Sequence, residues 1–102
     1  MKTIWKYTLE TADEQMIDVP IGAKILCVQS QHDQPRLWIE VNSEETEKEV
    51  RTIYTYGTGH KISNDTGRYI GTYQLRQGTL VFHCFEKGNE VNGKTGSQYN
   101  LK

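Results

Sequence analysis

Basic charge, paired metal ligands and long apolar runs are all scarce in this sequence of 102 residues. The 12 lysines and arginines are scattered and matched by 13 aspartates and glutamates, which leaves a net charge of −1. Nucleic-acid binders usually carry a basic excess or a clustered basic face. We therefore expect no nucleic acid among the partners.

Apolar stretches of membrane-spanning length are missing, and the opening phrase MKTIWKYTLE has no apolar segment of the kind that directs export. We therefore expect a cytoplasmic protein that makes no contact with a membrane. Cysteines are also few, and Cys27 and Cys84 should be reduced thiols in that compartment.

Motifs that carry chemistry are equally rare. The histidines and cysteines show none of the short paired spacings of structural zinc sites, so we expect no metal and no cofactor. The glycines of 57–67 suggest a phosphate-binding loop, but such a loop must lead into a helix, and residues 61–68 lack a helical pattern. We interpret them as an ordered turn. His60, with Asp65 nearby, is the best candidate for a general base, and no catalytic residue is assigned.

The sequence is well supplied with short segments of β-forming residues separated by turn signals. They cover residues 3–9, 15–19, 23–29, 36–42, 50–56, 69–75 and 79–85. Regular short strands without a long helical period are typical of sandwiches and small barrels. We predict one all-β domain over 1–86, a sandwich or small barrel of about seven mostly antiparallel strands, followed by a flexible tail over 87–102.

Two of these segments have informative patterns. The nearly continuous apolar run over 25–28 predicts a strand that is buried on both faces or lies centrally in a sheet. Residues 36–42 alternate strictly, which places Leu37 and Ile39 on one face and Trp38 on the other. A strand of this second kind has one face toward the core and one toward solvent.

Aromatic residues are the most informative class for function. Tyr54 and Tyr56 should share one strand face, and we expect the same of Tyr69 and Tyr73. Such rings either fill the core and cover a sheet, or form a contact surface, because they combine a large area with a polar group. The candidate binding residues are Tyr54, Tyr56, His60, Tyr69, Tyr73 and Trp38.

Acidic residues concentrate at 10–18 and at 40–49. They form either two solvated segments or an acidic surface that faces a basic partner.

Several phrases together resemble a known family. They are MKTIWKYTLE, DVPIGAKILCVQSQ, LWIEV, RTIYTYGTGHKI and YIGTYQLRQGTLVFHCFE, spread over residues 1–86. They are similar to a family of small uncharacterised proteins of tailed bacteriophages and prophages. The resemblance implies a phage origin and action in the cytoplasm of the infected bacterial host, and it carries no mechanism.

The function expected on these grounds is that of a phage-encoded accessory protein that binds a host or phage protein. One role of this kind is the inhibition of a host defence protein. The first alternative is a homo-oligomeric structural or assembly protein that pairs through an exposed sheet edge. The second is a small hydrolase or ligand-binding protein centred on His60.

Overall fold

The computed structural model describes residues 1–87, and all regular structure in that range is β-strand. The strands are β1 (Lys2–Thr8), β2 (Glu14–Pro20), β3 (Lys24–Gln31), β4 (Gln34–Asn42), β5 (Lys48–Gly57), β6 (Arg68–Leu75) and β7 (Leu80–Lys87). The predicted domain end at residue 86 falls one residue before the end of β7. Apart from Lys87, the expected tail lies outside the described residues.

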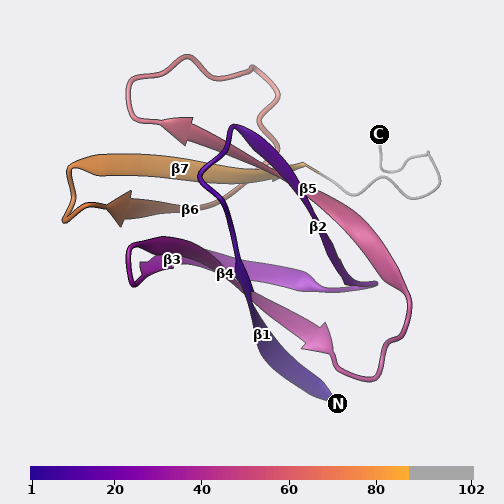
Figure 1. Cartoon of the computed structure of the whole chain (residues 1–102). Helices are drawn as coiled ribbons and strands as arrows, with labels where there is room; N and C mark the ends of the chain where they lie inside the picture. Colours follow the sequence, from indigo (N-terminus) through magenta and orange to yellow (C-terminus); the bar gives the residue numbers. More distant parts are fainter. Residues whose placement is uncertain (88–102) are drawn as a thin grey trace.

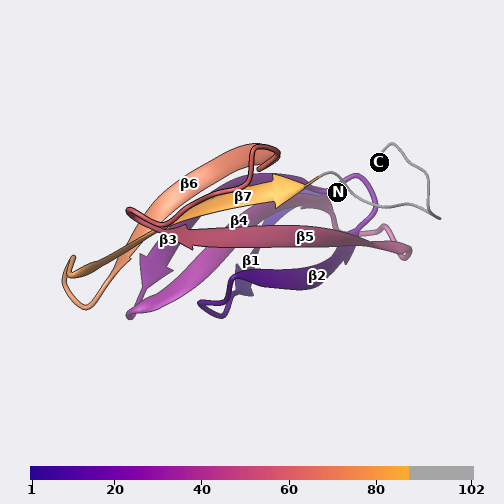
Figure 2. The ribbon, with the colours of Figure 1, turned by 90° about the horizontal axis from the view of Figure 1, so that it is seen from above.

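The strands form two sheets that pack as layers (Figure 1). One sheet has the order β1-β4-β3 and the other has the order β2-β5-β7-β6, and every pairing is antiparallel. Figure 2 shows the second sheet from above, with its strands in that order across the view. The predicted all-β fold of about seven antiparallel strands is confirmed, and its form is a sandwich of two sheets.

The core lies between the sheets because alternate residues of each strand point inward. Leu37 and Ile39 of β4 lie on the face opposite Trp38, as the alternation predicts, and the structure shows that the face with Leu37, Ile39 and Val41 is the buried one. The fully or nearly buried hydrophobic residues are Leu9, Val19, Ala23, Ile25, Val28, Leu37, Ile39, Val41, Ile53, Ile70, Tyr73 and Cys84. The described chain contains no helix, and hence none that could cross a membrane.

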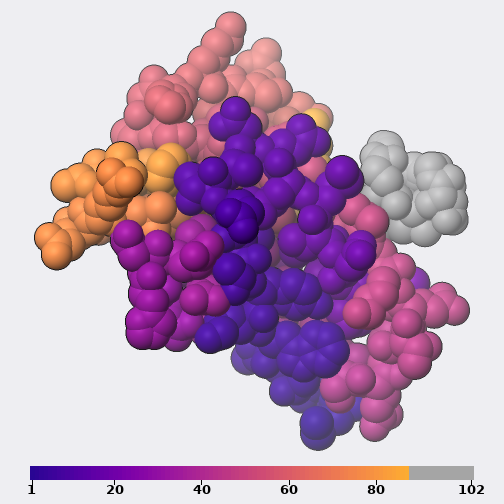
Figure 3. All heavy atoms as spheres, viewed as in Figure 1, coloured from indigo at the N-terminus to yellow at the C-terminus, as the bar shows by residue number. Residues whose placement is uncertain are grey.

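The segment between β1 and β2 crosses from one sheet to the other at the front of the molecule (Figure 3). Leu9 is buried there, and its amide nitrogen donates to the carbonyl oxygen of Pro35 over 2.9 Å. Further along, the amide nitrogen of Thr55 donates to the carbonyl oxygen of Asp13 over 3.0 Å. The crossing is thus attached to β4 and to β5.

The expectation for residues 25–28 is wrong. Their strand, β3, lies at the edge of its sheet, and Leu26 is 38% exposed. The register between β3 and β4 shifts at this residue, as at a β-bulge, which breaks the alternation of side chains. The sequence shows only an apolar run and gives no sign of the bulge.

The edge of β3 lies close to β6 of the other sheet. A Cβ atom at Gly71 would lie 3.1 Å from Cγ1 of Val28 and 3.5 Å from its backbone nitrogen and oxygen. Glycine therefore allows the two backbones to approach at this point.

The same two strands are also connected through their hairpins. The tips carry left-handed residues, among them Asp33 with a φ of 60° and Arg76 with a φ of 52°. The amide nitrogen of Arg76 donates to Oδ1 of Asp33 over 2.7 Å, which joins the β6–β7 turn to the β3–β4 turn.

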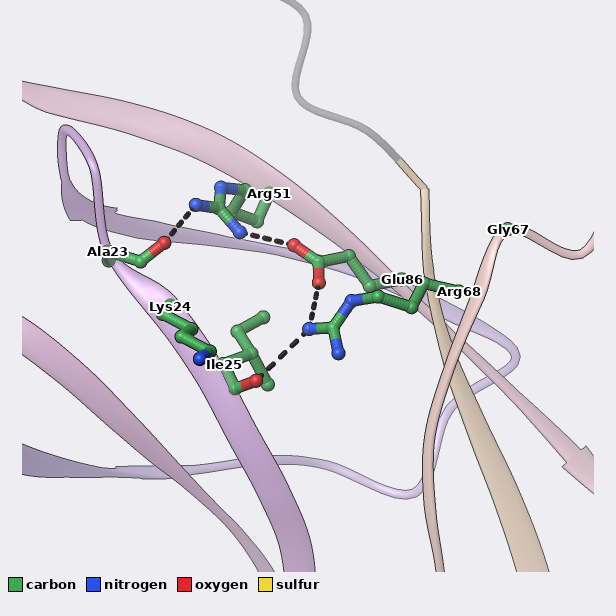
Figure 4. A pocket seen from close by; sticks show the side chains of 7 residues that line it. All are labelled: Ala23, Lys24, Ile25, Arg51, Gly67, Arg68 and Glu86. Carbon is green, nitrogen blue, oxygen red and sulfur yellow. Dashed lines mark hydrogen bonds and ion pairs between the residues drawn. The ribbon is translucent and has the colours of Figure 1, made fainter.

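Charged side chains bridge the sheets at the opposite end of β3 (Figure 4). Arg51 of β5 donates both to the carboxylate of Glu86 on β7 and to the carbonyl oxygen of Ala23. Arg68 of β6 donates to the same carboxylate over 2.8 Å and to the carbonyl oxygen of Ile25 over 3.0 Å. Each arginine thus connects the four-stranded sheet to the backbone at the start of β3.

This charged network also changes the interpretation of the acidic segment 40–49. Nε of Arg51 lies 2.9 Å from the carboxylate of Glu49, and both side chains are largely buried. Glu49 is therefore part of the network and not of a solvated acidic surface. A pocket of about 520 Å³ lies beside these groups and is also lined by Lys24 and Gly67.

Replacing Gly67 by alanine is expected to destabilise the fold by about 3 kcal/mol, because the residue has a φ of 85° and its Cβ would overlap the carbonyl oxygen of Glu86. Gly22→Ala is the matched control, since Gly22 has a φ of 86° and nothing within 4 Å of the added carbon. Gly22→Ala should lower the free energy of unfolding by only about 1–2 kcal/mol, the strain of a side chain in the left-handed conformation. Urea denaturation measures the free energy of unfolding of both variants. Equal losses of stability would contradict the close approach of Gly67 to Glu86.

Replacing Glu86 by alanine is expected to cost about 2–3 kcal/mol, because Arg51 keeps its pairing with Glu49 but loses its charge-assisted hydrogen bond to Glu86. Lys2→Ala is the control, because it removes an ion pair with Glu40 in which the lysine side chain is exposed. The control should change the free energy of unfolding by less than about 1 kcal/mol. A Glu86→Ala protein as stable as Lys2→Ala would show that the network is dispensable.

Candidate binding surface

The outer surface of the four-stranded sheet carries a row of aromatic side chains. Tyr54 of β5 and Tyr69 of β6 both lie opposite Phe85 of the central strand β7. In the next row of the sheet, Tyr56 lies opposite His83. We call these five residues (Tyr54, Tyr56, Tyr69, His83 and Phe85) the aromatic face.

The rings of the aromatic face hold one another in place. Tyr56 and Tyr69 each contact Phe85 edge to face, with ring centroids 5.8 Å and 5.5 Å apart. Such contacts add about 0.5–1.5 kcal/mol per pair to the burial of the rings. Tyr69 nevertheless remains 53% exposed, so a large part of a fixed ring is open to a partner.

A chain of hydroxyl groups fixes His83 within this surface. Its Nδ1 lies 2.9 Å from Oγ1 of Thr72, and its Nε2 lies 2.7 Å from Oγ1 of Thr58. The hydroxyl of Tyr69 lies 2.5 Å from the same Thr72 oxygen. Both imidazole nitrogens are therefore occupied, which sets the orientation of the ring.

The glycine-containing loop after β5 borders the aromatic face. The amide of Thr58 donates to the carbonyl oxygen of Val81 over 3.1 Å, which attaches the start of the loop to β7. The His60 ring lies against Gly57, where an added Cβ would come within 3.0 Å of ring atoms. The loop is thus an ordered turn, as the sequence predicts, and glycine makes room for the His60 ring.

Two small pockets flank His60 and Tyr56. The first, of about 190 Å³, is lined by Tyr56, Gly57, Thr58, Gly59, His60, Ile62, Tyr69, His83 and Phe85. The second, of about 310 Å³, is lined by Asp13, Glu14, Tyr54, Thr55, Tyr56, His60 and Lys61. We call them the apolar pocket and the acidic pocket.

Four of the six candidate binding residues come together here, namely Tyr54, Tyr56, His60 and Tyr69. Trp38 lies elsewhere, on the outer surface of the three-stranded sheet, where Nζ of Lys6 lies 5.7 Å from its ring centroid. The topology therefore separates Trp38 from the other exposed candidate residues.

The expectation that Tyr69 and Tyr73 share a face is wrong. The register between β6 and β7 shifts between Tyr69 and Gly71, which reverses the alternation along β6. Tyr73 is only 2% exposed, packs on Phe82 and has its hydroxyl 3.1 Å from Oγ1 of Thr11. Burial raises the pKa of Tyr73, which is a core residue and does not belong to the aromatic face.

Sequence reasoning missed three residues of the site, Phe85, His83 and Ile62. A signal for two of them exists, because strict alternation along 79–85 places His83 and Phe85 on one strand face. The pairing of β7 between β5 and β6, which brings that face beside the tyrosines, is a property of the tertiary structure. Ile62 lies in a loop and has no periodic signal.

The polar groups considered for catalysis do not assemble. The carboxylate of Asp65 lies 3.1 Å from Nζ of Lys87, and within residues 1–87 it forms no hydrogen bond or ion pair with His60. The Asp65 hydrogen bond raises the pKa of Lys87. No cluster of three or more His, Cys, Asp or Glu side chains within the described range could hold a metal ion.

The structure defines the class of this protein, and the comparison with known proteins shows its family. The fold and surface are those of a small β-sandwich with an exposed aromatic sheet face. Residues 1–94 match the family described as Domain of unknown function (DUF7352), and the chain belongs to that family. No curated protein and no solved structure matches the chain.

The Cys84 thiol is expected to be inert in the folded protein. Cys84 is buried, and desolvation raises its pKa, so the reactive thiolate is disfavoured. Titration with a disulfide reagent at pH 8 should modify the partly exposed Cys27 first and Cys84 only after unfolding in urea. Equal rates for the two thiols in the native protein would contradict this burial.

Proposed function

We propose that this protein is a phage-encoded accessory protein that acts inside the bacterial host by binding a host or phage protein through the aromatic face. The observation that carries the proposal is the set of packed, partly exposed rings beside two pockets. Tyrosine and phenylalanine are enriched at protein interfaces, and charged residues are depleted from interface centres. The phage assignment rests on the resemblance of the sequence phrases.

The rigidity of the surface supports this function. Binding is weakened by the ordering of mobile side chains, at a cost of about 0.5–1.5 kcal/mol for each rotamer-rich group. The rings of Tyr56 and Tyr69 are already held by Phe85, and His83 is held by two threonine hydroxyls. A partner would therefore meet a surface with little left to order.

The apolar pocket is smaller than most small-molecule sites, whereas the adjoining acidic pocket of about 310 Å³ lies at the lower limit of their range. Small-molecule sites usually enclose about 300–1,000 Å³. The apolar pocket has about 190 Å³, which suits a single protruding side chain. Aromatic anchors around such a pocket are the usual centre of binding energy in a protein interface.

Self-assembly through sheet edges is a second candidate, because β1 and β2 end their sheets and Met16 on β2 is 69% exposed. Both edges, however, carry residues that discourage pairing, namely Lys2 and Lys6 on β1 and Pro20 on β2. The aromatic face has no such protection. We therefore prefer binding to a different protein.

A capture experiment with matched variants tests the proposal. The tagged protein, a Tyr56→Ala/Tyr69→Ala variant and a Trp38→Ala variant are incubated with lysate of a phage-infected bacterial host, and captured proteins are identified by mass spectrometry. A protein captured by the wild type should bind the double variant at least tenfold more weakly and so be lost. Trp38→Ala should retain it, since Trp38 lies on the other sheet. Circular dichroism checks that both variants are folded.

If the double variant captures the same proteins as the wild type, the aromatic face is not the binding surface. Light scattering on the purified protein tests the second candidate, because a dimer or larger assembly that persists in the double variant would favour pairing through β1 or β2.

A further inference from the structure

The apolar and acidic pockets lie side by side, because Tyr56 and His60 line both of them. Tyr54 and Tyr56 are two residues apart on β5 and point the same way, so their side chains leave the strand about 7 Å apart. Two side chains of one bound segment could therefore occupy both pockets at once.

The apolar pocket is suited to an uncharged side chain. Its walls are the rings of Tyr56, Tyr69 and Phe85 together with Ile62, Thr58 and the imidazoles of His60 and His83, and no aspartate, glutamate, lysine or arginine lines it. An aliphatic or aromatic side chain that enters it removes apolar surface from water without taking a charge out of water. A charged side chain would find no lysine, arginine or carboxylate of opposite charge there.

The acidic pocket is suited to a cation. The carboxylates of Asp13 and Glu14 are exposed, and among the described residues neither has a hydrogen bond or an ion pair. Glu14 lies directly opposite Tyr54 in the sheet. Partial burial and then the negative charge of Glu14 raise the pKa of Tyr54, as expected for a phenol that lies beside a carboxylate.

Arginine is the cation that the acidic pocket fits best. Its planar guanidinium can pair with carboxylates and stack on an aromatic ring. Nζ of Lys87 already lies 5.8 Å from the ring centroid of Tyr54, so Tyr54 has a cation beside it. An incoming guanidinium would instead contact the ring of Tyr56 and the carboxylates of Asp13 and Glu14. Lys61 also lines the pocket and offsets one of the two negative charges, which leaves a net charge of −1.

We propose that the aromatic face recognises an extended segment of its partner with an apolar side chain and an arginine two residues apart. In an extended chain, residues i and i+2 emerge on the same side, about 7 Å apart, which is the spacing of adjacent same-face positions on β5. This inference rests on the proposed function and names the chemistry of its ligand.

Titration of the labelled full-length protein with short blocked peptides, followed by amide chemical shifts, tests this recognition. The probe peptide is Gly-Phe-Thr-Arg-Gly, acetylated and amidated. Shifts should concentrate at Tyr56, His60 and Tyr69. Replacing the probe's Phe by Ala, replacing its Arg by uncharged citrulline, or making the two residues adjacent should each weaken binding at least fivefold.

Two charge variants of opposite sign provide the matched control. Glu14→Gln removes a negative charge from the acidic pocket and should weaken binding of the arginine peptide about threefold, with no effect on the citrulline peptide. Lys61→Gln removes a positive charge from the same pocket and should strengthen it by a similar factor. Both residues are exposed, so neither change should disturb the fold.

Failure of the inference can be told apart from failure of the proposed function. If Glu14→Gln weakens the arginine and citrulline peptides equally, or if no peptide shifts the pocket signals, the inference is overturned. If the captured protein depends on Tyr56 and Tyr69 but is unaffected by Asp13→Asn with Glu14→Gln, the binding surface stands and the arginine assignment falls. If Tyr56→Ala/Tyr69→Ala changes neither peptide binding nor capture, both are wrong.

Discussion

The carboxylate of Glu86, held between Arg51 and Arg68, ties the two sheets together at one end of the sandwich. Both arginines also donate to carbonyl oxygens at the start of β3, so one charged network specifies how that edge sits against the other sheet. Buried ion pairs often add little net stability, but removal of one partner is costly. Here the network specifies position, while the apolar core between the sheets supplies most of the driving force.

The position of β6 follows from this arrangement and shapes the outer surface. Arg68 fixes one end of β6, and Gly71 allows the strand to approach Val28. The register shift after Tyr69 changes the face on which the following side chains lie. That shift sends Tyr69 outward to Phe85 and Tyr73 inward to Phe82. The same strand therefore contributes one ring to the aromatic face and one to the core.

The functional proposal depends on a division between a rigid sheet and an attached loop. The sheet presents Tyr54, Tyr56 and Tyr69 at fixed spacings, and the loop adds His60 and Ile62 at its margin. Placing functional side chains on packed strands limits the entropy lost on binding. Membership of the DUF7352 family is consistent with this picture but assigns no activity.

Local sequence determined much of this protein. Period-two alternation and turn residues were enough to predict about seven strands, the separation of Leu37 and Ile39 from Trp38 on β4 and the grouping of Tyr54 with Tyr56, because these depend on neighbouring residues alone. The tertiary structure decided the edge position of β3, the burial of Tyr73 and the meeting of Phe85 with the tyrosines. These depend on bulges and on the order of strands in the sheets, which are set by contacts between residues distant in sequence.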